Sequence, residues 1–191
     1  MLSNPKLIPE VQFMAQVEQD SGIAVSACYQ CKKCTNGCPV TFAMDLYPDQ
    51  VIRLVQIGQQ KAVLNCSTIW VCSACETCTT RCPNEVDVAG IMDYLKEQAI
   101  KSGIDIPQPR TYAFHRVFLE DIGRRGRVFE GGLLPRYMFQ SGEIWRKLKD
   151  RELKDDLELA YHLFRKGRLA LTPQGIRARA AIKKILANST G

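Results

Sequence analysis

The chain has 191 residues, 46% of them hydrophobic and 24% charged, a composition typical of a folded protein rather than a disordered one. No stretch approaches the roughly 20 consecutive apolar residues that cross a bilayer, and residues 1–10 lack a basic start followed by an apolar run. We therefore expect a cytoplasmic protein without a transmembrane segment.

The net charge of +6 is unevenly distributed. Residues 1–100 carry 7 Lys and Arg against 10 Asp and Glu, a balance of −3, whereas residues 101–191 carry 19 against 10, a balance of +9. This asymmetry favours an N-terminal module that holds a site and a basic C-terminal half that contacts another molecule. The basic clusters are short and seldom interleaved with aromatic residues, which favours a protein partner over a nucleic acid.

The predicted elements begin with a helix over Glu10–Gln19, within an N-terminal helical extension over residues 1–25. A run of cysteines then follows at Cys28, Cys31, Cys34 and Cys38, and Pro39 comes directly after it. Beyond this run, Pro48 suits a first helical position, and Val51, Leu54 and Val55 predict a helix that ends near Gly58.

A second cysteine run repeats the first at a constant offset of 44 residues. Its members are Cys72, Cys75, Cys78, Cys82 and the adjoining Pro83. Each copy reads C-x2-C-x2-C-x3-C-P, the ligand pattern of bacterial two-cluster ferredoxins. The absence of a signal peptide and the packing of eight thiols into two short windows argue against a disulfide framework. Zinc fits the overlapping triplet poorly, so two 4Fe-4S clusters are favoured over zinc and over a single damaged or three-iron cluster.

A cubane of iron and sulfide needs one thiolate at each of four iron corners. Three cysteines at short intervals wrap around three corners, and in this pattern the fourth cysteine of each run ligates the other cluster. The pattern therefore predicts two crossed ligand sets. They are Cys28, Cys31, Cys34 and Cys82 for the first cluster, and Cys72, Cys75, Cys78 and Cys38 for the second.

The remaining cysteine and the basic residues beside the runs are not expected to be cluster ligands. The ninth cysteine, Cys66, is a buried inert thiol in our interpretation, although a redox role beside a cluster stays open. Lys32, Lys33 and Arg81 flank ligands, where they either offset cluster charge, dock an acidic partner or form ordinary solvated surface.

The second run precedes a helix whose apolar positions recur from Val88 to Ala99, with Gly103 as its C-terminal cap. Further helices are predicted over Tyr112–Ile122, with Gly123 behind it, over Leu153–Phe164 and over Gly175–Ala187. Pro and Gly residues predict breaks over 104–110, 130–135 and 172–173. These elements give a mainly α fold with a cluster-binding domain over 26–104 and a basic helical region over 105–191 for subunit docking.

The two runs separated by a helix resemble the alpha-helical ferredoxin domain of iron-sulfur subunits in oxidoreductase complexes. More closely, Tyr29–Val40, Met44–Pro48 and Ile69–Cys72 resemble the C subunit of heterodisulfide reductase. The resembling motifs cover about residues 26–95, and all eight cysteines of the runs match the family's ligand pattern.

This resemblance implies an electron-transfer protein without a substrate site of its own. In that family, the C subunit relays electrons between the A subunit, which holds flavin and iron-sulfur clusters, and the disulfide-reducing B subunit. Hydrogenase or formate dehydrogenase subunits join some assemblies. The sequence does not choose between this role and an iron-sulfur subunit for sulfur oxidation or of the succinate dehydrogenase or fumarate reductase kind, and a regulatory iron-sulfur module also stays open.

Overall fold

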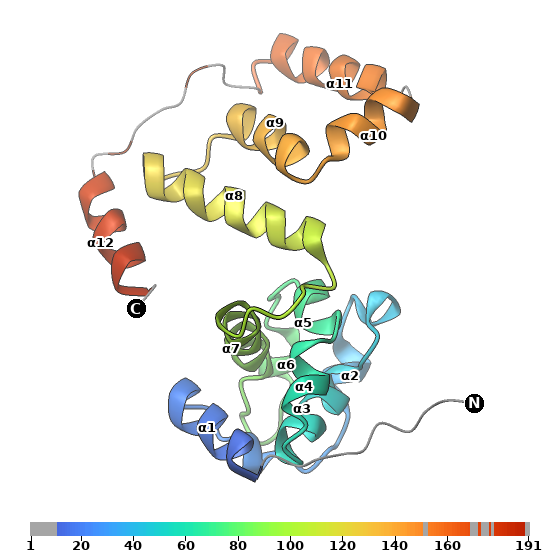
Figure 1. Ribbon diagram of the computed structural model, residues 1–191, viewed down its shortest axis with the longest axis vertical. Helices are drawn as coiled ribbons and strands as arrows, with labels where there is room; N and C mark the ends of the chain where they lie inside the picture. Colours follow the sequence, from blue (N-terminus) through green and yellow to red (C-terminus); the bar gives the residue numbers. More distant parts are fainter. Residues whose placement is uncertain (1–10, 151–152, 169–171, 173–175, 177, 190–191) are drawn as a thin grey trace. The chain divides into compact units, whose positions relative to one another are not determined.

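A computed structural model describes residues 11–150, 153–168, 172, 176 and 178–189. These residues form helices and connecting turns and include no strand, so the predicted mainly α fold is confirmed (Figure 1). The chain divides into two compact units between Gln108 and Pro109. The first unit contains all nine cysteines. None of the described helices combines the length and hydropathy of a membrane span.

The first unit consists of short helices around the cysteine runs, followed by one longer helix. They are α1 (Val11–Ser21), α2 (Lys33–Gly37), α3 (Pro48–Gln56), α4 (Gln60–Leu64), α5 (Thr68–Val71), α6 (Thr77–Thr80) and α7 (Val88–Lys101), with 3-10 turns at Val25–Ala27 and Thr41–Ala43. Each cysteine run thus leads into a helix that the sequence predicts, α3 after the first run and α7 after the second.

Local chemistry explains where α3 and α7 begin. Pro48 occupies the first position of α3, where its missing N–H has no intrahelical role, and Gln50 accepts a 2.8 Å hydrogen bond from the Tyr47 N–H. Asp87 caps α7 by accepting a 2.9 Å hydrogen bond from the Gly90 N–H. At its far end, Gly103 adopts φ +64°, the left-handed conformation that closes a helix C-terminus.

The core of the first unit is formed by the apolar faces of these helices. Helix α7 packs against α1, α4, α5 and α6, and α3 packs against α1, α2 and α4 (Figure 1). The largest fully buried side chains are Trp70, Ile52, Leu64, Ile69, Ile91, Met92 and Leu95. Each such side chain contributes about 1.5–3 kcal/mol through burial, so the core is the rigid base on which the two cysteine runs lie.

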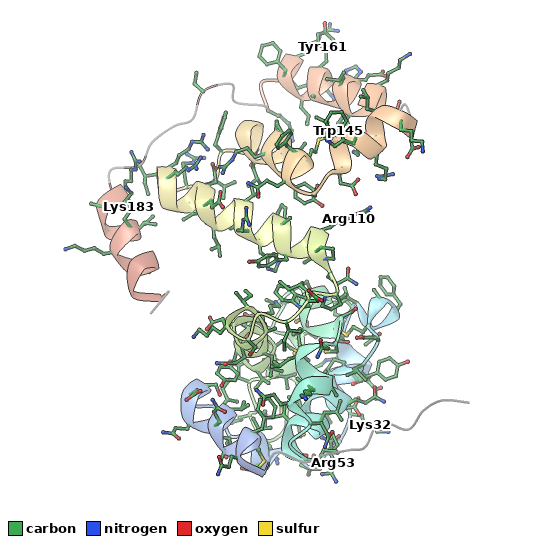
Figure 2. All side chains as sticks on the ribbon, viewed as in Figure 1. Lys32, Arg53, Arg110, Trp145, Tyr161 and Lys183 are labelled. Atoms are coloured by element: carbon green, nitrogen blue, oxygen red, sulfur yellow. The ribbon has the colours of Figure 1, made fainter. Side chains whose placement is uncertain are left out.

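The second unit is also helical but has few buried apolar residues. It comprises α8 (Pro109–Arg125), α9 (Glu130–Gln140), α10 (Glu143–Asp150), α11 (Leu153–Arg165) and α12 (Arg179–Ser189). Helix α8 packs against α9 and α12, and α10 packs against α9 and α11. Among the described hydrophobic residues of this unit, only Val117 is buried. Trp145 and Tyr161, labelled in Figure 2, are exposed on α10 and α11.

A buried carboxylate connects α8 to α9. Asp121 has no exposed surface, forms ion pairs with Arg125 and Arg136, and accepts a 2.7 Å hydrogen bond from the Phe129 N–H at the start of α9. The predicted break over 130–135 is therefore wrong, because Asp121 satisfies an N–H at the helix start and the helix continues through Gly131 and Gly132.

Other boundaries also differ from the predicted ones. Helix α8 runs through Gly123 to Arg125, and α10 was not predicted. Helix α12 starts at Arg179, four residues after the predicted start at Gly175, which lies outside the described residues. The predicted first residue of the N-terminal helix, Glu10, also lies outside them, and α1 extends to Ser21.

Candidate metal centre

The two cysteine runs fold into loops with the same backbone conformation. In the first loop, Gln30 and Lys32 adopt φ +64° and +63°, on either side of Cys31. In the second, Ala74 and Glu76 adopt φ +50° and +61°, on either side of Cys75. The left-handed residues thus recur at the same offset of 44 residues as the cysteines. The repeat in the sequence is a repeat in structure.

Left-handed conformation is unfavourable for these residues, because each carries a Cβ. The penalty is about 1–2 kcal/mol per residue, and such strain persists where the surrounding structure holds it and a site uses it. Alternation of left-handed and right-handed residues turns successive backbone N–H groups toward one side, forming the anion-binding concavity common at iron-sulfur sites. The loops therefore fit an anionic iron-sulfur cluster, both in their thiols and in their backbone.

A threonine and an aspartate fasten each loop to the helix that follows it. Thr79, between Cys78 and Cys82, donates a 2.8 Å hydrogen bond to Asp87 and accepts one at 3.2 Å from the Ala89 N–H of α7. In the first loop, Thr35 donates to Asp49 and accepts a 3.2 Å hydrogen bond from the Asp49 N–H in α3. We call these two arrangements the Thr–Asp latches. They fix the turn before the fourth cysteine of each run.

The carbonyl of the first cysteine in each loop is held by a long polar side chain. Gln56 of α3 donates a 2.8 Å hydrogen bond to the Cys28 carbonyl, and Lys96 of α7 donates one at 3.4 Å to the Cys72 carbonyl. Lys96 is buried and pairs with Asp93 at 2.8 Å. The two loops are therefore supported alike, but only the second has a buried positive charge beside its first cysteine.

Four of the predicted ligands from both runs meet at one cavity. Cys38 of the first run lines it together with Cys72, Cys75 and Cys78 of the second, and the cavity is partly open to solvent. The rest of the lining comes from Ser73 and Thr77 of the second loop and from apolar side chains of the two following helices and the segments before them: Val40, Met44, Pro48, Val88, Ala89 and Met92. Among the described residues, no three His, Cys, Asp or Glu side chains converge in a way that suits a single metal ion.

The other four predicted ligands lie in the first loop and at the end of the second. The exposed Tyr29 side chain has Cys28, Cys31 and Cys82 as electrostatic neighbours, and some loss of hydration together with these thiols raises its phenol pKa. Cys34 has Cys28 as an electrostatic neighbour. Cys82 accepts a 3.3 Å hydrogen bond from the Val86 N–H, and α2 packs against α6, so the two runs lie in contact.

Burial sets the protonation of several thiols. It raises the pKa of Cys34 and Cys72, and it raises the pKa of Cys78 to about 11. The Thr77 hydroxyl, 3.4 Å from Cys75, lowers the pKa of that more exposed thiol. Because iron is bound by the thiolate form, these half-buried thiols must release protons when a cluster is bound.

Cys66 does not line the cavity that Cys38 shares with the second run. It is 3% exposed, and burial raises the pKa of its thiol. A protonated thiol of this kind is a weak nucleophile. Nearby, Asp45 accepts hydrogen bonds from the Ser67 and Thr68 N–H groups at 2.8 and 2.9 Å, so it fastens the segment before α3 to the start of α5.

Sequence reasoning missed the Thr–Asp latches and the support from Gln56 and Lys96. The recurrence of Thr35 and Thr79 at the repeat offset was a usable signal for the hydroxyls. The aspartates gave no such signal, because Asp49 and Asp87 are not separated by 44 residues.

Comparison with known proteins agrees with this geometry. Residues 24–86 match the 4Fe-4S dicluster domain family. The C subunit of the H(2):CoB-CoM heterodisulfide,ferredoxin reductase of Methanothermobacter marburgensis is 27% identical over 96 residues, which cover 50% of this chain and 52% of the relative.

Two further relatives carry similar names. The iron-sulfur C subunit of the CoB--CoM heterodisulfide reductase of Methanopyrus kandleri is 29% identical over 102 residues, covering 52% of this chain and 53% of the relative. The C subunit of the ferredoxin:CoB-CoM heterodisulfide reductase of Methanosarcina acetivorans is 28% identical over 147 residues, covering 74% of this chain and 58% of the relative.

The chain spans about half the length of the first of these curated relatives. The matched region contains both cysteine loops and the contact between them. Residues 24–86 therefore match a 4Fe-4S dicluster domain, which together with the two cysteine runs gives two 4Fe-4S clusters as the cofactors, and the chain is similar to the C subunits of heterodisulfide reductases.

Proposed function

We propose that this chain is the electron-transfer component of a heterodisulfide reductase-type complex. It would relay electrons between an A-type subunit that holds flavin and iron-sulfur clusters and a B-type subunit that reduces a disulfide. When bound, each 4Fe-4S cluster accepts and passes on single electrons. The observation that carries the proposal is the pair of matching cysteine loops in contact within one unit, since two redox centres this close form a path for electrons.

Two crossed ligand sets are part of the proposal. Cys28, Cys31, Cys34 and Cys82 would hold one cluster, and Cys72, Cys75, Cys78 and Cys38 the other. The cavity that Cys38 shares with three thiols of the second run supports the second set. The grouping of Cys28, Cys31 and Cys82 around Tyr29 supports the first. Protein side chains would position the thiols, and the Thr–Asp latches would fix the turns between them.

Paired substitutions test the crossing. Under crossed ligation, Cys38→Ser with Cys72→Ser removes two ligands of the same cluster, so the purified protein keeps one intact cluster of about four iron atoms. Cys38→Ser with Cys34→Ser then damages both clusters. Ligation within each run predicts the reverse, because Cys34 and Cys38 would share a cluster. Iron and acid-labile sulfide counts from anaerobic preparations, with the electron paramagnetic resonance of the reduced protein, distinguish the two outcomes.

The second unit is assigned to subunit docking. Its described apolar side chains are mostly exposed, including Leu134, Phe139 and Trp145, and the half of the chain that contains it is basic. Exposed aromatic and aliphatic side chains in this number are typical of a surface that a partner covers. Its partners would be the A-type and B-type subunits, with hydrogenase or formate dehydrogenase subunits in a larger assembly. The names of some relatives mention H(2) or formate for their own complexes.

Anaerobic purification of the tagged full chain from its host tests the relay. The expected result is co-purification of a flavoprotein and a disulfide-reductase-like protein, with both clusters reducible in the recovered complex. Recovery of a lone chain, or of clusters that the partner cannot reduce, would contradict the proposal.

A further inference from the structure

The two cysteine loops share one backbone but differ in charge. At positions related by 44 residues, Lys32 of the first loop corresponds to Glu76 of the second, and Lys33 corresponds to Thr77. Lys32 and Glu76 have the same left-handed conformation and are both exposed. Because the backbone is matched, the difference in side-chain charge is not a requirement of the fold.

A third cation reaches the first loop from the second run. A Cβ placed on Gly37 would lie 2.6 Å from Nη1 of Arg81, so the arginine side chain covers the backbone of the first loop where glycine leaves space. Lys33, Asn36 and Arg81 line one open hollow there. We call Lys32, Lys33 and Arg81 the basic island. Lys32 is labelled on the surface of the first unit in Figure 2.

The charges of the basic island are not used within the described part of the chain. All three side chains are exposed, and no described carboxylate pairs with any of them. The surroundings are acidic, because residues 1–100 have a balance of −3, and each bound cluster with its thiolates adds about −2. Three unpaired cations in an acidic unit create a local positive field that orients an approaching charged molecule.

The basic island adjoins the exposed edge of the first cysteine loop. Cys31 is exposed between Gln30 and Lys32, and the Tyr29 ring beside it is 61% exposed. An aromatic side chain with lysine and arginine around it has the composition of a small interface, in which the ring is covered and the charges form the rim. The thiol at its centre belongs to the loop proposed to hold a redox centre.

We infer that the basic island is the docking site for an acidic face of a protein redox partner, which thereby meets the Cys31 edge rather than the Cys75 edge. This inference rests on the proposed function and deepens it, because it assigns one end of the relay to one kind of partner surface. A protein fits better than a nucleic acid, since three cations give few phosphate contacts and the domain around them is negative.

The test compares two charge reversals in the full cluster-loaded chain. Lys32→Glu with Lys33→Glu removes two cations of the basic island. Lys61→Glu with Lys101→Glu changes two exposed lysines, on α4 and α7, that are not part of it and serves as the charge-matched control. Each protein is tagged, purified anaerobically with its partner from the host, and assayed for partner affinity over a range of salt concentrations. Iron counts confirm that the clusters are intact.

If the basic island is the docking site, the double variant should bind the partner about tenfold more weakly at 0.1 M ionic strength and with a smaller salt dependence than wild type. The control should bind the partner as wild type does. Carbodiimide coupling of the wild-type complex should join Lys32 or Lys33, but not Lys61, to partner Asp or Glu residues. Equal affinity and salt dependence in the three proteins would overturn the inference while leaving the relay intact. Salt-dependent retention on DNA through these lysines would also overturn it. If no redox partner co-purifies with the wild-type chain, the proposed function is wrong, and the inference about the basic island is wrong as well.

Discussion

The Thr79 latch offers the sharpest test of how the loops are held. Thr79→Val keeps the shape of the side chain and removes its hydroxyl. The hydrogen bond to Asp87 at 2.8 Å is lost, and the buried Ala89 N–H loses the partner at 3.2 Å. A hydrogen bond to a charged group contributes about 1.5–3 kcal/mol, and an unsatisfied buried N–H costs about 1–3 kcal/mol.

Asp87 still caps α7 through the Gly90 N–H, so part of the structure remains and the combined effect is about 2–4 kcal/mol on local opening. Since 1.4 kcal/mol is a factor of ten, amide hydrogen exchange in the first turn of α7 should quicken by about 30-fold to 700-fold. The measurement is hydrogen exchange by mass spectrometry on the anaerobic, cluster-loaded chain.

Thr79→Ser is the matched control, because it keeps the hydroxyl and deletes one methyl group. We expect its exchange to change by about fourfold or less, the effect of roughly 0.8 kcal/mol for one methyl group. Unchanged exchange in Thr79→Val, or the same increase in both variants, would refute the latch. Faster exchange throughout α7 would also count against it, because the latch contacts only the first turn.

Three further perturbations test other contacts. Lys96→Gln keeps a donor for the Cys72 carbonyl and removes a buried positive charge. The midpoint potential of the adjacent cluster should therefore fall by roughly tens of millivolts in a redox titration, and an unshifted potential would refute the electrostatic role. Burial acts to raise the pKa of Asp45, but hydrogen bonds from Ser67 and Thr68 outweigh it and hold the pKa below the usual 3.8. The stability that Asp45 contributes is therefore present above pH 3.8 and lost as the pH falls through the lower, folded-state pKa. Asp45→Asn should reduce this loss of stability at acid pH in unfolding measurements, and an unchanged pH dependence would contradict the contact. Asp121→Asn should cost the second unit about 3 kcal/mol, with proteolysis between α8 and α9 and unchanged iron content; a resistant variant would contradict the contact.

The sequence predicted the parts of the fold that a simple spacing rule determines. Ligand spacing follows from the geometry of the cluster, and the periodicity of α3 and α7 follows from their burial on one side. The break over 130–135 was wrong because turn-forming residues were overridden by a contact from Asp121, which lies eight residues before Phe129. Such a contact depends on how α8 and α9 pack, so it cannot be predicted from a local sequence pattern.

A local pattern was available for the thiols of the proposed site but not for the side chains that support them. Thiol positions repeat along the chain, whereas each latch joins a loop residue to a helix start at a different separation, 14 residues in one copy and eight in the other. The left-handed residues were also missed. Lys32 and Glu76 are not residue types that favour this conformation, so only the fold around them reveals it.

The contacts of each side chain explain why some positions of the repeat are the same in both copies and others differ. Thr35 and Thr79 must remain threonine-like, because each hydroxyl both donates to and accepts from the following helix or its cap. Lys32 and Glu76 carry the same backbone strain whatever their side chains, because that strain arises at the Cβ. Their exposed ends make no contribution to the fold, so charge at these two positions can differ between the copies at little cost to stability. A duplicated loop is therefore free to acquire different partners at its two redox edges without any change in how it holds its cysteines.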